Sequence, residues 1–183
     1  LVSLNLVLQN GSDTDPIAKS GLATMTADVL DEGTKTRTSL QIAEELDFIG
    51  ANLSVNASID GSFITLNTMT KHLDKALAVY ADVIVNPIFP QKDFDRLKQQ
   101  RLAALLQQKD RAATIASLSF NKIIYGPDHP YGMNASGNEA SIKSLTREDL
   151  VAFYEAYYRP NNDTFLIVGD ATLKSITPKL DKL

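Results

Sequence analysis

The sequence predicts an α+β fold, with a mixed, largely antiparallel sheet and helices packed on one face. Asp60-Gly61 separates two stretches of alternating apolar and polar residues, which is typical of a β-hairpin. Because the two strands of a hairpin run antiparallel, an all-parallel, doubly wound sheet is excluded. Other segments repeat apolar residues every three or four positions, as amphipathic helices do. Elements of these two kinds pack as separate layers.

Composition narrows the class of protein. The chain contains no cysteine, which excludes disulfides and thiolate metal sites. Its formal net charge of −4 gives no reason to expect nucleic acid or an anionic membrane as a partner. No apolar run approaches the roughly 20 residues of a transmembrane helix.

The length of the chain suits one sizeable core. No repeat, low-complexity tract or linker divides it, so we expect residues 1–183 to form a single α+β domain. The chain opens at Leu1 without a start methionine, and we expect it to be a fragment of a longer multi-domain protein.

The first part of the chain is predicted to form a strand and two helices. Val2 to Gln9 alternates apolar and polar residues, as a half-buried strand does. Gly21 to Thr34 is predicted to be one helix, closed by a glycine. A second helix begins at Thr38, with Gln41 at the capping-box spacing. The apolar side of this second helix is expected to be Leu40, Ala43, Leu46 and Ile49.

The turn Asp60-Gly61 also predicts the register of the hairpin. Both positions of a two-residue turn favour residues that accept positive φ. The predicted pairs are Ile59 with Ser62, Ala57 with Ile64, and Val55 with Leu66. In this register the apolar residues of both strands lie on one face.

The remaining chain is predicted to be mostly helical. The expected helices run from Thr70, as the cap, to Asn86, from Lys92 to about Gln108, from Thr114 to Tyr125, from Thr146 to Tyr158, and after Asp170 towards Leu183. The inward residues of the 92–108 helix are expected to be Phe94, Leu97, Leu102, Leu105 and Leu106. Thr164 to Val168 is predicted to be a buried strand.

The first helix has a second face, opposite its apolar stripe. This face carries Thr24, Ala27, Asp28 and Asp31. From these residues alone, it is interpreted as a solvated helix face. Some metallopeptidases carry two zinc-binding histidines at such i and i+4 positions, but there are none here.

Short motifs along nearly the whole chain resemble the insulinase/pitrilysin family of zinc peptidases. They are Gly21-Leu22-Ala23, Gly33-Thr34, Thr38-Ser39, Phe48-Ile49-Gly50-Ala51, Asn86-Pro87-Ile88-Phe89, His129-Pro130-Tyr131-Gly132, Tyr158-Arg159-Pro160-Asn161-Asn162 and Val168-Gly169-Asp170. Each motif alone is weakly specific, whereas the set is specific. The resemblance implies the half-domain fold of these peptidases.

Active members of this family carry His-x-x-Glu-His on the first helix, where both histidines bind zinc and the glutamate activates water. By position, the first histidine matches Thr24, the glutamate matches Ala27, and the second histidine matches Asp28. The third zinc ligand, a glutamate on a later helix, matches Leu105. A lone carboxylate beside Thr, Ala and Leu cannot build a three-ligand zinc site. The resemblance therefore implies a degenerate site, with no catalytic or metal-binding residue.

The resemblance also implies a role for such a chain. These peptidases consist of two homologous halves, fused or separate, and typically only one half carries the zinc motif. This chain resembles the first domain of a non-catalytic half. We therefore expect it to be inactive alone, to help enclose an extended peptide substrate, and to assemble with a catalytic half that holds the zinc.

Two alternatives remain. In the first, the chain is a purely structural assembly subunit without peptide processing. In the second, it is part of a full-length active zinc protease whose motif lies upstream. A homodimer of the isolated fragment is also left open. From the resemblance alone, we expect a periplasmic or exported location in bacteria.

Two further features bear on a binding site. A histidine zinc site would need His72 and His129 to converge, and we expect instead that His129 fixes its own loop by a hydrogen bond.

One strand is a candidate sheet edge for binding a peptide by strand addition, either Val2 to Gln9 or Leu53 to Ile59. The competing interpretation for each is a paired interior strand.

Overall fold

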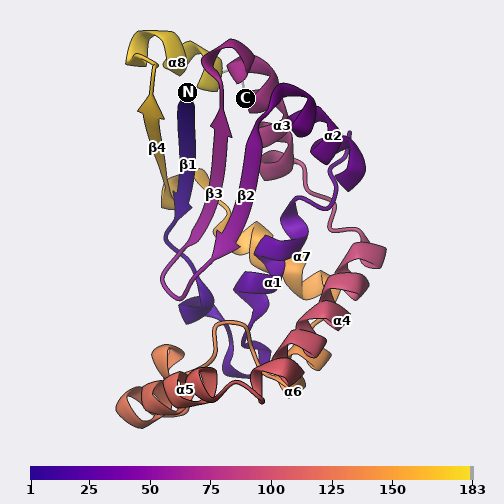
Figure 1. Cartoon of the computed structure of the whole chain (residues 1–183), viewed down its shortest axis with the longest axis vertical. Coiled ribbons are helices and arrows are strands. Elements are labelled where there is room, and N and C mark those ends of the chain that lie inside the picture. Colours follow the sequence, from indigo (N-terminus) through magenta and orange to yellow (C-terminus); the bar gives the residue numbers. More distant parts are fainter. Residues whose placement is uncertain (182–183) are drawn as a thin grey trace.

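The structure is a computed structural model that describes residues 1–181. Its four-stranded sheet has the order β2-β3-β1-β4, and all neighbouring strands are antiparallel (Figure 1). The strands are β1 (Val2–Leu8), β2 (Asn52–Ala57), β3 (Ser62–Thr68) and β4 (Asp163–Gly169). Helices pack against one face of this sheet, which confirms the predicted α+β class.

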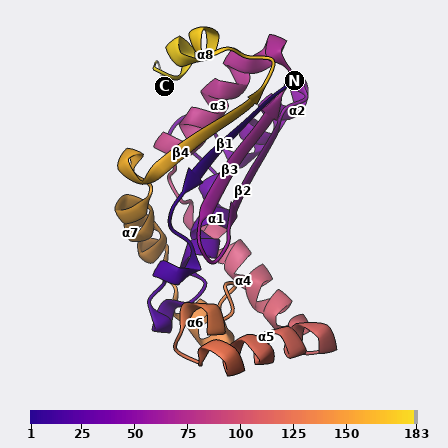
Figure 2. The same ribbon diagram turned by 90° about the vertical axis from the view of Figure 1, so that its left-hand side faces the viewer.

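The helices of the described residues follow the predicted order, except that α6 (Glu139–Ser144) was not predicted. They are α1 (Leu22–Leu30), α2 (Ser39–Ile49), α3 (Leu73–Val85), α4 (Gln91–Gln108), α5 (Ala112–Tyr125), α6 (Glu139–Ser144), α7 (Arg147–Tyr157) and α8 (Leu173–Leu180). The last two residues of the helix predicted towards Leu183 lie outside the described residues. Within residues 1–181, no helix combines the length and apolar character that crossing a bilayer requires. Figure 2 shows α4 leading away from the sheet to α5 at the far end of the molecule.

The core lies between the sheet and helices α1, α3 and α7. The buried residues of β1 are Val2, Leu4, Leu6 and Leu8, which alternate with half-buried ones as predicted. Tyr80 of α3 reaches between two strands. Its hydroxyl donates to the carbonyl of Ile64 (2.7 Å) and accepts from the backbone N–H of Leu6 (3.2 Å). This side chain therefore fixes α3 to the centre of the sheet.

Helix α1 is shorter than predicted, because it ends at Leu30 and not at Gly33. The chain after it forms an isolated β-bridge between Thr34 and Pro87. The Thr34 hydroxyl also donates to Asp82 of α3 (2.5 Å). These contacts with distant residues take the segment out of the helix, and the pattern within the segment cannot indicate them.

The β2–β3 hairpin is confirmed, but its turn is longer than predicted. The observed pairs are Ala57 with Ser62, Val55 with Ile64, and Leu53 with Leu66. Residues 58–61 form the loop, and the carbonyls of Ser58 and Ile59 accept from the backbone N–H groups of Ser12 and Asp13 (both 3.0 Å). This docking widens the turn. The shift in register is two residues, so the apolar faces still coincide.

Several side chains lie on another face than predicted. Leu40 is 65% exposed, and Ala43 and Leu106 are also exposed. The buried side of α2 consists of Ile42, Leu46 and Ile49. Two neighbouring stripes of α2 fit helical spacing, and packing against α3 selects one of them.

The start of α3 also differs from the prediction. Thr70 opens a short 3₁₀ turn, η3 (Thr70–His72), and does not cap α3.

Of the two candidate edges, the one at Leu53 to Ile59 is confirmed and the one at Val2 to Gln9 is not. β1 pairs with β3 and β4, so the prediction that it offers a free edge is wrong. Within the described residues, β2 pairs with β3 alone and forms one edge. β4 forms the other edge, and its predicted burial is wrong, since Val168 is 71% exposed. No strand of the described residues covers the outer side of β4.

Candidate functional site

A buried carboxylate fixes the start of α1, the helix that carries the candidate site. Asp15 accepts hydrogen bonds from the backbone N–H groups of Gly21 (2.8 Å), Leu22 (3.0 Å) and Ala23 (2.9 Å). These donors have no partner within the helix. Burial raises the pKa of Asp15 to about 6, although the three hydrogen bonds act to lower it. The position of α1 is thereby set from outside the helix.

The predicted site residues of α1 do not form a solvated face. Thr24 and Ala27 are buried, and Asp28 is partly exposed. The Thr24 hydroxyl lies 3.1 Å from the carbonyl of Ala135, in the loop before α6. The interpretation as a solvated helix face is therefore wrong for Thr24 and Ala27, because α4 and this loop cover them.

Arg101 of α4 contacts both Thr24 and Asp28, the two residues that the resemblance matches to the family's histidines. Its Nη1 donates to the Thr24 hydroxyl (3.1 Å) and to the carbonyl of Ser136 (3.3 Å). Its Nη2 forms an ion pair with the carboxylate of Asp28. The Arg101 side chain is only 14% exposed. Sequence reasoning missed Arg101 as a site residue, because it used this residue only to align Leu105. The one indication in the sequence is that Arg101 lies one helical turn before Leu105, on the same side of α4.

A second arginine strengthens the same contact between helices. Arg96 of α4 forms an ion pair with Glu32, just after α1 (2.7 Å). Leu105, at the position of the third ligand, is buried one turn beyond Arg101. The structure thus places Thr24 and Asp28 at one charged contact with α4, whereas Leu105 contributes only apolar surface.

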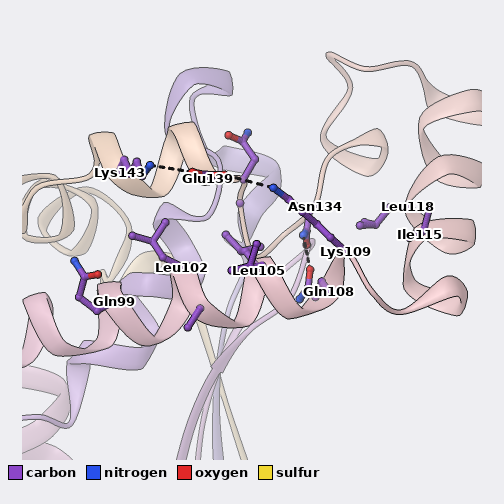
Figure 3. A pocket seen from close by; sticks show the side chains of 14 residues that line it. Gln99, Leu102, Leu105, Gln108, Lys109, Ile115, Leu118, Asn134, Glu139 and Lys143 are labelled. Carbon is purple, nitrogen blue, oxygen red and sulfur yellow. Dashed lines mark hydrogen bonds and ion pairs between the residues drawn. The ribbon is translucent and has the colours of Figure 1, made fainter.

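Leu105 also lines a cavity of about 530 Å³ between α4, α5 and α6. Figure 3 shows its side chains from α4 and α5, with Glu139 between Lys109 and Lys143. The apolar lining consists of Leu102, Ala103, Leu105, Leu106, Ile115 and Leu118. Glu139 accepts from Lys143 (2.9 Å) and Lys109 (3.5 Å), so its side of the cavity is charged.

A smaller groove of about 290 Å³ runs beside the free edge of β2. Asp31, Glu32 and Asp47 line it together with the first residues of β2. Burial raises the pKa of Asp31 to about 6, and the neighbouring carboxylates of Glu32 and Asp28 add to this effect. The groove is therefore acidic, and Asp31 is still mostly ionised at pH 7, although it takes up a proton more readily than an ordinary carboxylate.

The comparisons with known proteins define the family. Residues 1–123 match the model described as insulinase (peptidase family M16), which covers more than half of the chain. This chain belongs to the insulinase family. Residues 144–183 match a second model, described as peptidase M16 inactive domain.

Individual relatives agree with this assignment. An uncharacterized zinc protease of Rickettsia felis is 26% identical over 100% of this chain and 44% of its own length. A protein of Helicobacter pylori named non-peptidase homolog YmxG is 26% identical over 97% of this chain and 41% of its own. The crystal structure of a peptidase M16 inactive domain from Pseudomonas fluorescens superposes with a TM-score of 0.92, at 29% identity, over 98% of this chain and 43% of that one. The chain therefore spans less than half the length of these relatives.

The residues that the resemblance matches to the zinc ligands do not fit zinc. Thr24 offers a hydroxyl, Asp28 a carboxylate and Leu105 no donor atom, and the first two already bind a guanidinium. Across residues 1–181, no three His, Cys, Asp or Glu side chains gather where they could hold a metal ion. The Nδ1 atom of His129 accepts from the backbone N–H of Tyr131 (3.2 Å), so this histidine fixes its own loop, as predicted.

Proposed function

We propose that this chain is a non-catalytic part of a zinc-peptidase-like protein, which helps to enclose an extended peptide and assembles with a catalytic homologous half. The observation that carries the proposal is the Arg101 guanidinium between Thr24 and Asp28. In this proposal, zinc belongs only to the partner half. The match to the inactive-domain model and the name of the H. pylori relative support the non-catalytic role.

The free edge of β2 is the proposed peptide site. An exposed edge strand presents unpaired backbone donors and acceptors, to which an extended peptide can add as a further strand. The groove beside this edge carries Asp31, Glu32 and Asp47. Carboxylates at this place favour peptides with Lys or Arg side chains.

The outer surface of α5 is the proposed contact with the partner half. No residue of α5 is buried. Its large exposed apolar residues are Ile115, Phe120, Ile123, Ile124 and Tyr125. A 14-residue helix is marginal in water without packing of its apolar side, so a partner that covers this surface would stabilise it.

A second candidate is a segment of a full-length active zinc protease whose motif lies outside this chain. The name of the R. felis relative, which is more than twice as long as the segment matched here, favours it. A purely structural subunit differs from both in one respect, since it would bind no peptide. Peptide binding therefore separates the proposals.

The experiment titrates the 183-residue chain into a fluorescently labelled, unstructured peptide rich in Lys and Arg, with anisotropy as the signal. We expect saturable binding that weakens with added salt. Asp31→Asn combined with Asp47→Asn should weaken binding about fivefold, because two of the carboxylates in the groove become neutral.

The matched control is Glu148→Gln combined with Glu155→Gln on α7, which removes the same charge elsewhere. It should change the affinity less than about twofold. Absence of binding, or an equal loss with the control pair, would overturn the proposed peptide site.

A further inference from the structure

A cation already stands between the two positions where active relatives bind zinc. We propose that the Arg101 guanidinium takes the place of the metal: it neutralises Asp28, joins α4 to α1, and keeps divalent cations away from this face. This inference rests on the proposed function and deepens it. One consequence is that two histidines restored at positions 24 and 28 would still meet a fixed positive charge.

The geometry supports this role. Thr24 and Asp28 are i and i+4 residues of α1, so their side chains lie one above the other on the same face. This spacing also lets two histidines share a zinc ion. Arg101 contacts both side chains, and it contacts Ser136 as well. Its guanidinium therefore occupies the space between the two side chains.

The chemistry of arginine explains the exclusion of metal. A guanidinium stays charged at every relevant pH and offers only hydrogen-bond donors. A divalent ion beside it would meet a like charge, and it would have to compete with Arg101 for the carboxylate of Asp28. Because the Arg101 side chain is largely buried, solvent and salt screen this repulsion weakly.

The same contact supplies the structural part of a metal's role. A zinc ion with ligands from α1 and α4 would tie the two helices together. Arg101 ties them with hydrogen bonds and an ion pair, and it adds the loop at Ser136. Leu105, one turn further, continues the contact with apolar surface. The helices thus keep their arrangement without a metal.

The test measures zinc affinity in variants of the 183-residue chain. The parent variant is Thr24→His with Asp28→His, in which Arg101 is retained. Adding Arg101→Gln should strengthen Zn²⁺ binding by about tenfold or more, measured by calorimetry and by the absorption spectrum of Co²⁺. The matched control adds Arg96→Gln, which removes another arginine of α4 that pairs with Glu32, and it should change the affinity less than about threefold.

Equal zinc affinity with and without Arg101, or an equal gain in the Arg96 control, would overturn the inference. This outcome is distinct from failure of the proposed function, which would be zinc-dependent peptide cleavage by the unmodified chain.

Because two histidines in a packed helix can prevent folding, a second measurement uses milder changes. Asp28→Asn, Arg101→Gln and their combination are compared by urea unfolding. If the two groups act as one unit, the combination should lower the unfolding midpoint no more than Arg101→Gln does alone. Additive losses would overturn the inference.

Discussion

Asp82 is a buried carboxylate that ties the segment after α1 to α3. It accepts from the hydroxyls of Thr34 (2.5 Å) and Thr36 (2.6 Å) and from Nη1 of Arg37 (2.8 Å). Burial alone would raise its pKa, but the hydrogen bonds outweigh burial and lower the pKa from 3.8 to about 2. The folded pKa lies below the unfolded one, so this stabilisation is complete above about pH 4 and is lost as the pH falls towards 2.

Asp82→Asn should therefore destabilise the chain in a pH-dependent way. We expect the free energy of unfolding to fall by about 2–3 kcal/mol at pH 7 and by much less near pH 2.5. Urea unfolding at both pH values, followed by circular dichroism, measures the difference. Asp74→Asn, at an exposed position of the same helix, is the control. An equal loss at the two pH values would contradict the assignment.

Tyr80 supports a second residue-scale prediction. Tyr80→Phe removes the hydroxyl that serves both Leu6 and Ile64, and it leaves two buried backbone groups without this partner. The expected loss is about 1–3 kcal/mol in the free energy of unfolding. Tyr125→Phe, at a half-exposed position, should change it by less than about 0.5 kcal/mol. Similar values for the two variants would show that the buried hydroxyl does not hold α3 to the sheet.

At the site, the family resemblance singles out two residues of α1 but does not say what they contact. Thr24 and Asp28 are matched to the histidines by the motifs along the chain. The contact with Arg101 depends on the rotation of α4 about its axis. This helix is polar on several sides and therefore gives a weak signal for its inner face. The ion pair could be seen only after the helices were placed.

At the scale of elements, the sequence predicts a helix end or a turn correctly where contacts between residues close in the sequence determine it. The capping box of Thr38 and Gln41 is present, as predicted, and Gly50 ends α2 in a left-handed conformation. The Asp60-Gly61 signal predicts the hairpin correctly. Its register is wrong by two residues because contacts with Ser12 and Asp13, far away in the sequence, widen the turn. Long-range contacts also end α1 early.

Helix α5 supports a prediction at the same scale. Ile123 is 81% exposed, so Ile123→Lys should change the free energy of unfolding of the isolated chain by less than about 0.5 kcal/mol. The same change should weaken association with a catalytic homologous half at least about tenfold, because it puts a charge into an apolar contact. Sedimentation of mixtures measures this association. Leu40→Lys makes the same kind of change at an exposed position of α2 and should leave the association unchanged. Weaker association with both variants would argue against α5 as the contact.

At the scale of the whole molecule, the chain keeps the fold of its family, and we propose that it has lost the zinc chemistry. Helix α1 is enclosed between the sheet, α4 and α7, and its start is fixed by buried hydrogen bonds. Of the residues that the resemblance matches to the zinc ligands, Thr24 and Asp28 contact the guanidinium of Arg101, and Leu105 lies one helical turn beyond it. Fold and site are therefore separable, since packing preserves the first and only a few side chains decide the second.

The most direct test of the central claim is zinc content and peptide cleavage by the unmodified chain. The chain is purified, incubated with Zn²⁺, dialysed, and analysed for metal by atomic spectroscopy and for cleavage of an unstructured peptide by mass spectrometry. A non-catalytic chain should retain far less than one zinc per molecule and should show no cleavage that a chelator abolishes. Stoichiometric zinc together with chelator-sensitive cleavage would contradict the account.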